Sequence, residues 1–258
     1  MKQFTGQVIA NYYVAEGYYE MKFLWDKSAG IPQPGQFFTI RISTQTDPLL
    51  RRPFAFAGFH ASTSSAAVIY QVRGKGTEIL LHTPPDTEID LAGPFGNAFT
   101  QPDDGQPNMV LAGGIGLGPM LYLAQALQQQ QQPVQFIYGC RNLDLIPGHK
   151  GFHSLNPVIC TDDGSEGFGG TVVDYLQAQA DTLAAGTRLY ACGPLAMMRG
   201  CHQFALEHDL SCLVSMEAMM ACGVGACAGC VVKTVAAPGY ARVCKEGAVF
   251  DSRELVWD

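Results

Sequence analysis

MVLAGGIGLGP, residues 109–119, is the stretch that decides the fold of this chain. Its first four residues are apolar and predict a short buried strand, and the glycines after them predict a tight turn. Helical character then runs from Pro119 to about Gln132. A buried strand that leads through a glycine-rich turn into a helix is the expected first unit of a parallel α/β sheet.

The alternation of strands and helices continues along the chain. An apolar strand over residues 134–139 comes first, and two strand–helix pairs follow it. Their strands cover residues 156–160 and 187–192, and their helices cover residues 171–180 and 195–208. This order predicts a central, doubly wound parallel α/β domain.

The first 100 residues follow a different pattern. They contain short runs of strand character, such as residues 18–23, 36–42 and 66–72, broken by glycine and proline. Because no long helical periodicity interrupts these runs, a small antiparallel barrel or sandwich is expected. The polar, proline-containing residues 100–108 are typical of a surface connection.

We therefore expect an α+β multidomain chain with three parts. An N-terminal antiparallel β-barrel is assigned to residues 1–100, the doubly wound parallel α/β domain to residues 101–210, and a small cysteine-rich domain to residues 211–258. A chain of 258 residues exceeds the usual size of one domain, which agrees with this division.

Composition and charge argue against several classes of protein. With 47% hydrophobic and 15% charged residues the chain has a globular composition, and its net charge of −7 disfavours nucleic acid and anionic membranes as partners. The nine cysteines are odd in number and no signal peptide is evident, so disulfides and secretion are not expected. No run of about 18 apolar residues is available for a membrane span. A reducing cytoplasm is the expected compartment.

Four cysteines near the C-terminus carry the most specific chemistry. Cys222, Cys227 and Cys230 have the C-x4-C-x2-C spacing of a plant-type [2Fe–2S] cluster, and Cys244 follows as a more distant fourth ligand. The small residues between them let the backbone wrap closely around a cluster and direct N–H groups at its sulfurs. Residues 211–258 are therefore expected to form an iron–sulfur domain that moves single electrons and is held together by its metal centre.

Two other interpretations of these four cysteines stay open. Structural zinc is one, although zinc sites favour paired cysteines about two to four residues apart. Four ordinary buried thiols are the other. Buried structural thiols are also the expectation for Cys140, Cys160, Cys201 and Cys212.

The glycine-rich turn is a candidate for nucleotide binding. Gly113, Gly114 and Gly116 follow the predicted strand and precede the predicted helix, where a diphosphate can approach the backbone and the helix N-terminus. The pattern is G-G-x-G-x-x-P rather than the common G-x-G-x-x-G. A purely structural turn is the alternative.

Two more segments follow strands of the same predicted sheet, outside whose carboxyl ends ligands bind. Cys192, Gly193 and Pro194 end one strand, and the thiol there is a candidate to face a nicotinamide, or one more buried cysteine. Asp162 and Asp163 follow another strand and suit ribose hydroxyls rather than a 2′-phosphate, which favours NAD over NADP, although an Asp-Gly turn explains them as well. The residues assigned to NAD are Gly113, Gly114, Gly116, Cys192, Gly193 and Pro194.

Two segments of the first domain suit the anionic diphosphate of a flavin. Residues 51–56 (RRPFAF) place positive charge beside a rigid proline. Residues 73–77 (RGKGT) are predicted to form a flexible turn that carries more cations. Taken alone, each segment is more often a solvated strand end or a turn. Because both occur in one small barrel, a flavin-binding role is favoured for them.

Together these motifs resemble the ferredoxin–NADP reductase superfamily, through residues 52–55 and 76–77, the glycine-rich turn and residues 192–194. The tail is more specific. The stretch from Glu217 to Cys230, followed by VCKEG from Val243 and VFD from Val249, is similar to the electron-transfer subunits of class 1B dihydroorotate dehydrogenase. The resemblance spans essentially the whole chain.

This resemblance implies a relay of electrons between two subunits. A separate catalytic subunit oxidises dihydroorotate to orotate on FMN, in the de novo synthesis of pyrimidines (UMP), so no catalytic residue for that substrate is expected on this chain. Electrons then pass singly through the [2Fe–2S] cluster to FAD, which gives hydride to NAD+. The flavin stands in the middle because it exchanges both single electrons and hydride. The implied assembly is a heterotetramer, a dimer of heterodimers.

The family's binding residues fall on this chain motif by motif. The implied FAD residues are Arg52, Pro53, Phe54, Ala55, Ile69, Tyr70, Gln71, Gly76 and Thr77. The implied cluster ligands are Cys222, Cys227, Cys230 and Cys244. Ala55 departs from the family's motif, which has serine or threonine there, so a side-chain hydroxyl near the isoalloxazine is absent.

Two other functions remain as alternatives. The chain fits a flavin and iron–sulfur NAD(P)H reductase subunit that serves a different redox partner. It also fits a nucleotide-binding module with a structural zinc site, and colour distinguishes the two: flavin and cluster absorb visible light, whereas a zinc protein is colourless.

Overall fold

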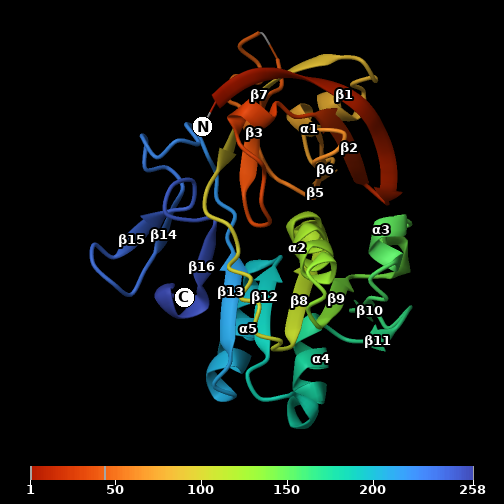
Figure 1. The fold of residues 1–258 in the computed structure, drawn as a ribbon, viewed down its shortest axis with the longest axis vertical. Helices are drawn as coiled ribbons and strands as arrows, with labels where there is room; N and C mark the ends of the chain where they lie inside the picture. Colours follow the sequence, from red (N-terminus) through yellow and green to blue (C-terminus); the bar gives the residue numbers. More distant parts are fainter. Residues whose placement is uncertain (1, 44, 258) are drawn as a thin grey trace.

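The computed structural model describes residues 2–43 and 45–257 and builds them around two seven-stranded sheets. The sheet of N-terminal strands and the sheet of later strands lie one beyond the other along the long axis of the molecule (Figure 1). A two-stranded hairpin from the C-terminal part lies to one side. This arrangement confirms the expected α+β fold class.

The first sheet is antiparallel and has the strand order β4-β3-β7-β1-β2-β6-β5. Its strands are β1 (Lys2–Ala15), β2 (Tyr18–Leu24), β3 (Phe37–Arg41), β4 (Arg52–Ala55), β5 (Gly58–His60), β6 (Ser65–Gln71) and β7 (Glu88–Phe95). Strand β1 pairs with β7 through its first half and with β2 through its second half, and it arches over the domain (Figure 1). The rings of Phe54 on β4 and Tyr70 on β6 lie 6.3 Å apart, so the sheet wraps round as the expected barrel requires.

Aromatic rings fill the inside of this barrel. Phe38 is 0% exposed, and its ring centre lies 5.0 Å from that of Phe23, 4.7 Å from that of Phe56 and 6.0 Å from that of Trp25. Rings of this size remove large apolar areas from water, and tilted or edge-on pairs are favourable. The shape of the barrel is therefore determined by packing.

The segment at residues 73–77 differs from the sequence-based expectation. Instead of a flexible turn, it leads into the short helix α1 (Lys75–Leu81). The Thr77 hydroxyl oxygen accepts hydrogen bonds from the backbone N–H of Arg73 at 2.9 Å and of Gly74 at 3.3 Å. These bonds stabilise the first turn, where backbone N–H groups otherwise lack partners.

The second sheet has the order β11-β10-β9-β8-β12-β13-β16 and is parallel except for β16 at its edge. Its strands are β8 (Asn108–Gly113), β9 (Val134–Cys140), β10 (Val158–Thr161), β11 (Phe168–Gly169), β12 (Arg188–Cys192), β13 (Ser211–Ser215) and β16 (Val249–Asp251). The remaining elements are α2 (Leu117–Gln129), α3 (Lys150–His153), α4 (Val172–Gln179), α5 (Leu195–Glu207), the hairpin strands β14 (Val231–Lys233) and β15 (Tyr240–Arg242), and the 3-10 turns η1 (Lys27–Ala29), η2 (Gly114–Gly116), η3 (Leu143–Leu145), η4 (Ala180–Thr182) and η5 (Ser252–Glu254).

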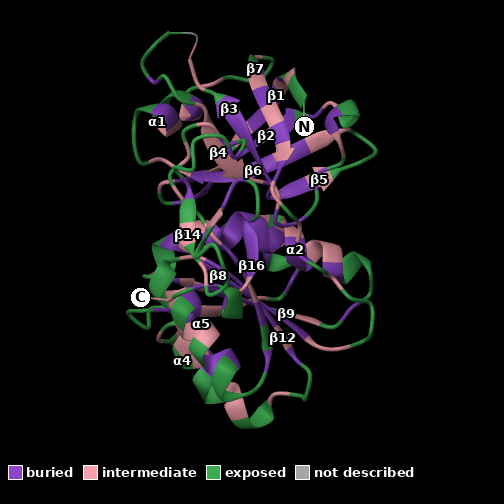
Figure 2. Ribbon diagram, turned by 90° about the vertical axis from the view of Figure 1, so that its left-hand side faces the viewer, coloured by how far each residue is buried: buried purple, intermediate pink, exposed green. Residues whose placement is uncertain are grey.

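Alternate residues of β8 face opposite sides of this sheet. Val110 and Ala112 join the core beneath α2, whereas Met109 and Leu111 join the core beneath α4 and α5. Helix α2 also packs against the barrel strands β5 and β6, so one helix is shared by both domains (Figures 1 and 2). Helices on both faces of a parallel sheet confirm the doubly wound arrangement.

The C-terminal part combines additions to this sheet with an irregular segment. Strand β13 pairs with β12 and strand β16 with β13, while β14 and β15 form a separate hairpin. Cys140, Cys160, Cys201 and Cys212 are all buried, as expected for structural thiols. Within residues 2–43 and 45–257, no helix is both long enough and apolar enough to cross a membrane.

Candidate functional site

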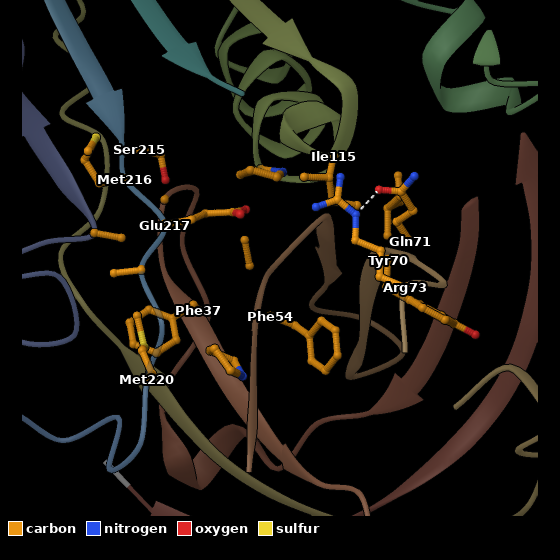
Figure 3. Close-up of a pocket in the computed structure, with 17 residues that line it drawn as sticks. Phe37, Phe54, Tyr70, Gln71, Arg73, Ile115, Ser215, Met216, Glu217 and Met220 are labelled. Carbon is orange, nitrogen blue, oxygen red and sulfur yellow. Dashed lines mark hydrogen bonds between the residues drawn. The ribbon is translucent and has the colours of Figure 1, made fainter. Parts of the chain in front are cut away.

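A cavity of about 230 Å³ lies where the barrel meets the second sheet and the C-terminal segment; we call it the inner cavity (Figure 3). Six of the nine residues expected at a flavin line it: Pro53, Phe54, Ala55, Ile69, Tyr70 and Gln71. They come from β4 and β6, which the curvature of the sheet brings face to face. The opposite wall includes Ile115 of η2, Pro119 in the first turn of α2, and residues at and after the end of β13.

The other three expected flavin residues, Arg52, Gly76 and Thr77, are not part of the cavity lining. Arg52 begins β4, and Gly76 and Thr77 lie in the first turn of α1. A Cβ atom on Gly76 would lie 3.3 Å from the Nε of Arg52, so the arginine packs directly over this glycine. The fold therefore brings the two cationic motifs of the barrel into contact.

The lining of the inner cavity suits a flat aromatic ring system. Phe37, Phe54 and Tyr70 supply ring surfaces, and Figure 3 shows Arg73 beside Gln71 at one end. The Tyr70 hydroxyl donates to Asn11 Oδ1 at 3.0 Å, and burial raises the pKa of Tyr70 to about 12, so it remains a neutral phenol. These residues fit the isoalloxazine of a flavin.

Ser215 is a hydroxyl-bearing residue of the inner cavity that the barrel motifs do not include. It ends β13, is 4% exposed and lines the same cavity. The cavity thus contains a serine hydroxyl, although it comes from the opposite domain. Sequence motifs of the barrel alone could not reveal this residue.

A second, larger cavity of about 880 Å³ opens beside the first; we call it the outer cavity. Four of the six residues expected at NAD line it: Gly113, Gly114, Gly193 and Pro194. Gly116 lies beneath its wall, where a Cβ atom would overlap the carbonyl oxygen of Cys192. This glycine is required for the close approach of the helix start to strand β12.

Cys192 also lies beneath the wall of the outer cavity. It is 1% exposed and is absent from the lining of both cavities. Burial raises the pKa of its thiol above the usual range, so the sulfur stays protonated. Gly193 and Pro194, not the thiol, form the surface at this strand end.

Side chains of both charges line the outer cavity. Arg73 and Arg141 bring positive charge, which suits a diphosphate, and Asp162 and Asp174 bring carboxylates, which suit ribose hydroxyls. Asp163 points elsewhere, because its Oδ1 accepts a hydrogen bond from the backbone N–H of Ser165 at 2.9 Å. Of the two expected acidic residues, Asp162 is therefore the one that lines the cavity.

Glu217 is a site residue to which sequence analysis gave no role. Together with Gln71, Arg73 and Ile115 it lines both cavities, and in Figure 3 it points into the inner one. Burial by the surrounding protein raises the pKa of its carboxyl group, and the positive charge of Arg73 reduces this rise. The residue is nevertheless exposed to the open cavity. Its position just after the carboxyl end of β13 was the signal available in the sequence.

The cysteine loop, residues 222–230, is organised by hydrogen bonds to sulfur. Cys222 Sγ accepts from the backbone N–H of Val224 at 3.5 Å and of Cys227 at 3.4 Å. Cys244 Sγ accepts from the N–H of Gly225 at 3.1 Å. Backbone N–H groups directed at sulfur are what an iron–sulfur cluster needs, and the four sulfurs fit that group.

The environments of the four cysteines differ. Cys230 and Cys244 are buried, whereas Cys227 is exposed. The backbone hydrogen bonds to Cys222 lower the pKa of its thiol, while burial raises the pKa of the Cys244 thiol. In the described part of the chain, no three His, Cys, Asp or Glu side chains converge as a site for a single metal ion.

Asn97 fixes the C-terminal segment against the barrel. Its Oδ1 accepts from the Val249 N–H at 2.9 Å, its Nδ2 donates to the Val249 carbonyl at 2.7 Å, and its own N–H donates to the Gly247 carbonyl at 2.7 Å. Met220, two residues before Cys222, lines the inner cavity. The cysteine loop thus begins at the wall of the candidate flavin site.

Two family models match this chain. The iron–sulfur cluster binding domain of dihydroorotate dehydrogenase B matches residues 217–256, and the oxidoreductase NAD-binding domain matches residues 110–203. These ranges contain the cysteine loop and the glycine-rich turn.

Curated relatives match over nearly the full length. The electron transfer subunit of dihydroorotate dehydrogenase B (NAD(+)) from Desulforamulus reducens is 38% identical, covering 100% of this chain and 99% of the relative. The protein of the same description from Caldanaerobacter subterraneus subsp. tengcongensis is 32% identical, covering 97% of each.

Solved structures share the fold. An NADH-dependent reduced ferredoxin–NADP oxidoreductase studied for flavin-based electron bifurcation aligns with a TM-score of 0.86 and 25% identity, covering 98% of this chain and 90% of that one. Phthalate dioxygenase reductase aligns with a TM-score of 0.67 and 13% identity, covering 91% of this chain and 87% of that one, and supports the fold alone.

Proposed function

The chain belongs to the family of electron transfer subunits of dihydroorotate dehydrogenase B (NAD(+)), and we propose that it carries electrons from a catalytic partner subunit to NAD+. It is an NAD-linked oxidoreductase subunit whose cofactors are FAD, a [2Fe–2S] cluster and NAD. In the proposed order, electrons leave dihydroorotate on the partner's FMN, pass through the cluster to FAD and reach NAD+. This places the chain in de novo pyrimidine synthesis.

The main support for this proposal is that the inner cavity lies next to both the outer cavity and the segments that contain the cluster cysteines. Four residues line both the inner and the outer cavity, so a ring in one lies next to a ring in the other. On its opposite side, Met220 and Ala248 connect the inner cavity to the segments that carry the cysteines. A flavin in the inner cavity therefore has the middle position that the relay requires.

The proposed residue roles follow the cavities. FAD is assigned to the nine barrel residues from Arg52 to Thr77 named above, NAD to the six residues of the glycine-rich turn and the end of β12, and the cluster to the four cysteines. When bound, FAD exchanges hydride with NAD and single electrons with the cluster. Arg73 and Arg141 bind the negative diphosphate of NAD, Asp162 favours NAD over NADP, and Glu217 presents a carboxyl group that can hold a proton at the junction.

The division of the chain and its assembly are further parts of the proposal. We keep the domains at residues 1–100, 101–210 and 211–258, with β13 and β16 hydrogen-bonded to the central sheet. A heterotetramer of two such chains and two FMN-containing catalytic subunits fits the relay. The reducing cytoplasm fits a chain in which none of the nine described cysteines forms a disulfide.

The test is a reconstitution. The purified chain, loaded with FAD and iron–sulfur cluster, is mixed with an FMN-containing dihydroorotate dehydrogenase catalytic subunit, and NADH formation from dihydroorotate and NAD+ is followed at the absorbance of NADH. NADH should form only when both subunits are present. If the loaded chain accepts electrons from NADH yet the mixture forms no NADH from dihydroorotate, the assigned partner is wrong.

The likeness to the ferredoxin–NADP oxidoreductase supports a second candidate, a reductase subunit for another redox partner. The chemistry on this chain would be the same, and the protein that co-purifies with it distinguishes the two functions. A colourless chain would instead support a structural zinc site and contradict both.

A further inference from the structure

The side chain of Arg242, at the end of β15, joins two segments that carry cysteines. Its Nη1 donates to the carbonyl oxygen of Gly225 at 2.6 Å, inside the cysteine loop. Its Nε donates to Glu246 Oε2 at 3.0 Å, and its Nη2 donates to Glu246 Oε1. A guanidinium holds such a pair of carboxylate oxygens in a fixed plane. One arginine therefore connects the cysteine loop to the segment around Cys244.

The backbone of the same residues shapes the turn that presents Cys244. The Arg242 carbonyl accepts from the N–H groups of Lys245 at 3.0 Å and of Glu246 at 2.9 Å, and the Arg242 N–H donates to Glu246 Oε2 at 2.8 Å. On the other side of the sulfur, Gly225 donates its N–H to Cys244 Sγ at 3.1 Å. The other N–H···S hydrogen bonds of the described residues measure 3.4 to 3.5 Å. The shortest of these bonds is therefore made by the residue whose carbonyl Arg242 holds.

We propose that the Arg242–Glu246 pair positions Gly225 so that its N–H donates to the sulfur of Cys244, and that the pair thereby sets the reduction potential of the cluster. This rests on the proposed function, because it requires a cluster on these cysteines. Arg242 and Glu246 are positioning residues, since neither supplies a ligand. An N–H group that donates to a ligand sulfur stabilises the more negative, reduced cluster, and so raises its reduction potential.

A simple charge effect would also link these residues to the cluster, but it predicts different signs. If charge alone acted, Glu246→Ala would remove a negative charge and raise the potential, while Arg242→Lys would keep the charge and leave the potential unchanged. If positioning acts, both substitutions release Gly225 and both lower the potential. The two substitutions together therefore separate the explanations.

The experiment is a potentiometric titration of the intact, cluster-loaded chain, followed by the EPR signal of the reduced cluster. For Arg242→Lys and Glu246→Ala, the ratio of reduced to oxidised cluster at a fixed potential should fall by about tenfold, which corresponds to about 59 mV for one electron. Lys245→Gln measures the effect of charge at the same loop, because the Lys245 side chain lies against Gly225 without joining the pair. Arg253→Lys, in the exposed ion pair with Asp209, should leave the potential unchanged.

A second measurement needs no redox-active cluster. Amide hydrogen exchange of Gly225 in the intact chain should be faster in both variants than in the parent, because its N–H loses its fixed partner. If a variant fails to hold iron, its exchange is compared with that of the iron-free parent, because loss of the cluster alone would also speed exchange in the loop. Unchanged exchange together with an unchanged potential, or a potential that rises in Glu246→Ala, would overturn the proposal.

Failure of this inference is distinct from failure of the proposed function. If the parent chain shows the EPR signal of a [2Fe–2S] cluster and passes electrons to NAD+, but the two variants match it, only the role of Arg242 and Glu246 is wrong. If the parent chain holds no cluster at all, the proposed function fails first.

Discussion

The barrel and the cysteine loop both form walls of one electron-transfer site, but different forces hold them in place. The barrel packs a set of fully buried rings around Phe38, whereas the loop contributes small residues and hydrogen bonds to sulfur. Figure 2 shows buried residues along the barrel strands β2, β3 and β6, whereas the hairpin strands β14 and β15 next to the loop contain only exposed or intermediate residues. Apolar burial stabilises the barrel without a ligand, but the loop depends on its metal centre. The comparison predicts that losing the cluster disturbs one wall of the site and spares the other.

Cys244→Ser is expected to have the largest effect and tests this separation directly. Serine removes a cluster ligand, so visible cluster absorbance and bound iron should be lost and transfer from the partner to NAD+ should stop. Because the barrel packs independently, FAD should stay bound and remain reducible by NADH. Iron content, FAD content and anaerobic reduction by NADH measure the three effects.

A thiol outside the loop provides the control. Cys160 is 0% exposed in the central sheet, and Cys160→Ala should retain the cluster. Continued reduction of NAD+ by dihydroorotate in Cys244→Ser would show that the cysteine loop is not on the electron path.

Phe38→Ala is the corresponding change in the barrel. It removes a ring that contacts Phe23, Phe56 and Trp25, and the cavity it leaves should lower the free energy of unfolding by about 3–5 kcal/mol. Denaturant unfolding followed by FAD release measures it. Leu50→Ala, at a side chain that is 45% exposed, should change the free energy by less than about 0.5 kcal/mol. Equal losses in the two variants would mean that packing does not hold the barrel wall.

Gly116→Ala tests a third kind of contact, backbone against backbone, at the wall of the outer cavity. The added Cβ would overlap the Cys192 carbonyl and push the start of α2 away from β12, at a cost of about 1–3 kcal/mol. NADH should bind more weakly, as a raised KM. Gly118→Ala is the matched control in the same helix, because its Cβ would lie 3.5 Å from the Cβ of Ala57, an ordinary contact. A KM unchanged in Gly116→Ala would contradict the close approach.

The sequence could predict those features that depend on local patterns of residues. The strand expected at residues 134–139 is β9 (Val134–Cys140), and the helix expected at residues 195–208 is α5 (Leu195–Glu207). Apolar runs and helical periodicity are local, so they are readable without the fold. The cysteine spacing is local too, and it led to the loop whose sulfurs accept backbone hydrogen bonds.

The sequence could not predict features that depend on contact between distant segments. Helix α1 escaped prediction because its seven residues begin with Lys-Gly-Thr, a turn-like sequence, and because Gly76 is covered by the distant residues Arg52 and Ile42. Glu217 lines both cavities because β13 ends where the two domains meet. No pattern within either segment contains that information.

The smallest expected effect on the free energy of unfolding comes from a substitution at Glu20, which makes a polar contact within the packed part of the molecule. Its carboxylate is buried, 3.3 Å from His149 Nε2 and 3.4 Å from Lys22 Nζ. Burial raises the pKa of Glu20, but the hydrogen bond and charge of His149, with those of Lys22, lower it more, so the folded pKa lies below the unfolded one. The carboxylate therefore stabilises the fold above the unfolded pKa of about 4.3, and this contribution is lost as the pH falls through the folded pKa.

Glu20→Gln should accordingly cost about 1 kcal/mol near neutral pH, and the difference from the parent should shrink in acid below about pH 4. Urea unfolding at several pH values measures this difference. Glu16→Gln, an exposed carboxyl group beside the same hairpin, should stay within about 0.5 kcal/mol of the parent at every pH. A difference for Glu20→Gln that grows in acid would have the wrong sign for a carboxyl group whose pKa is lowered by folding. The contact between β2 and the segment before α3 would then rest on packing alone, as the barrel core does.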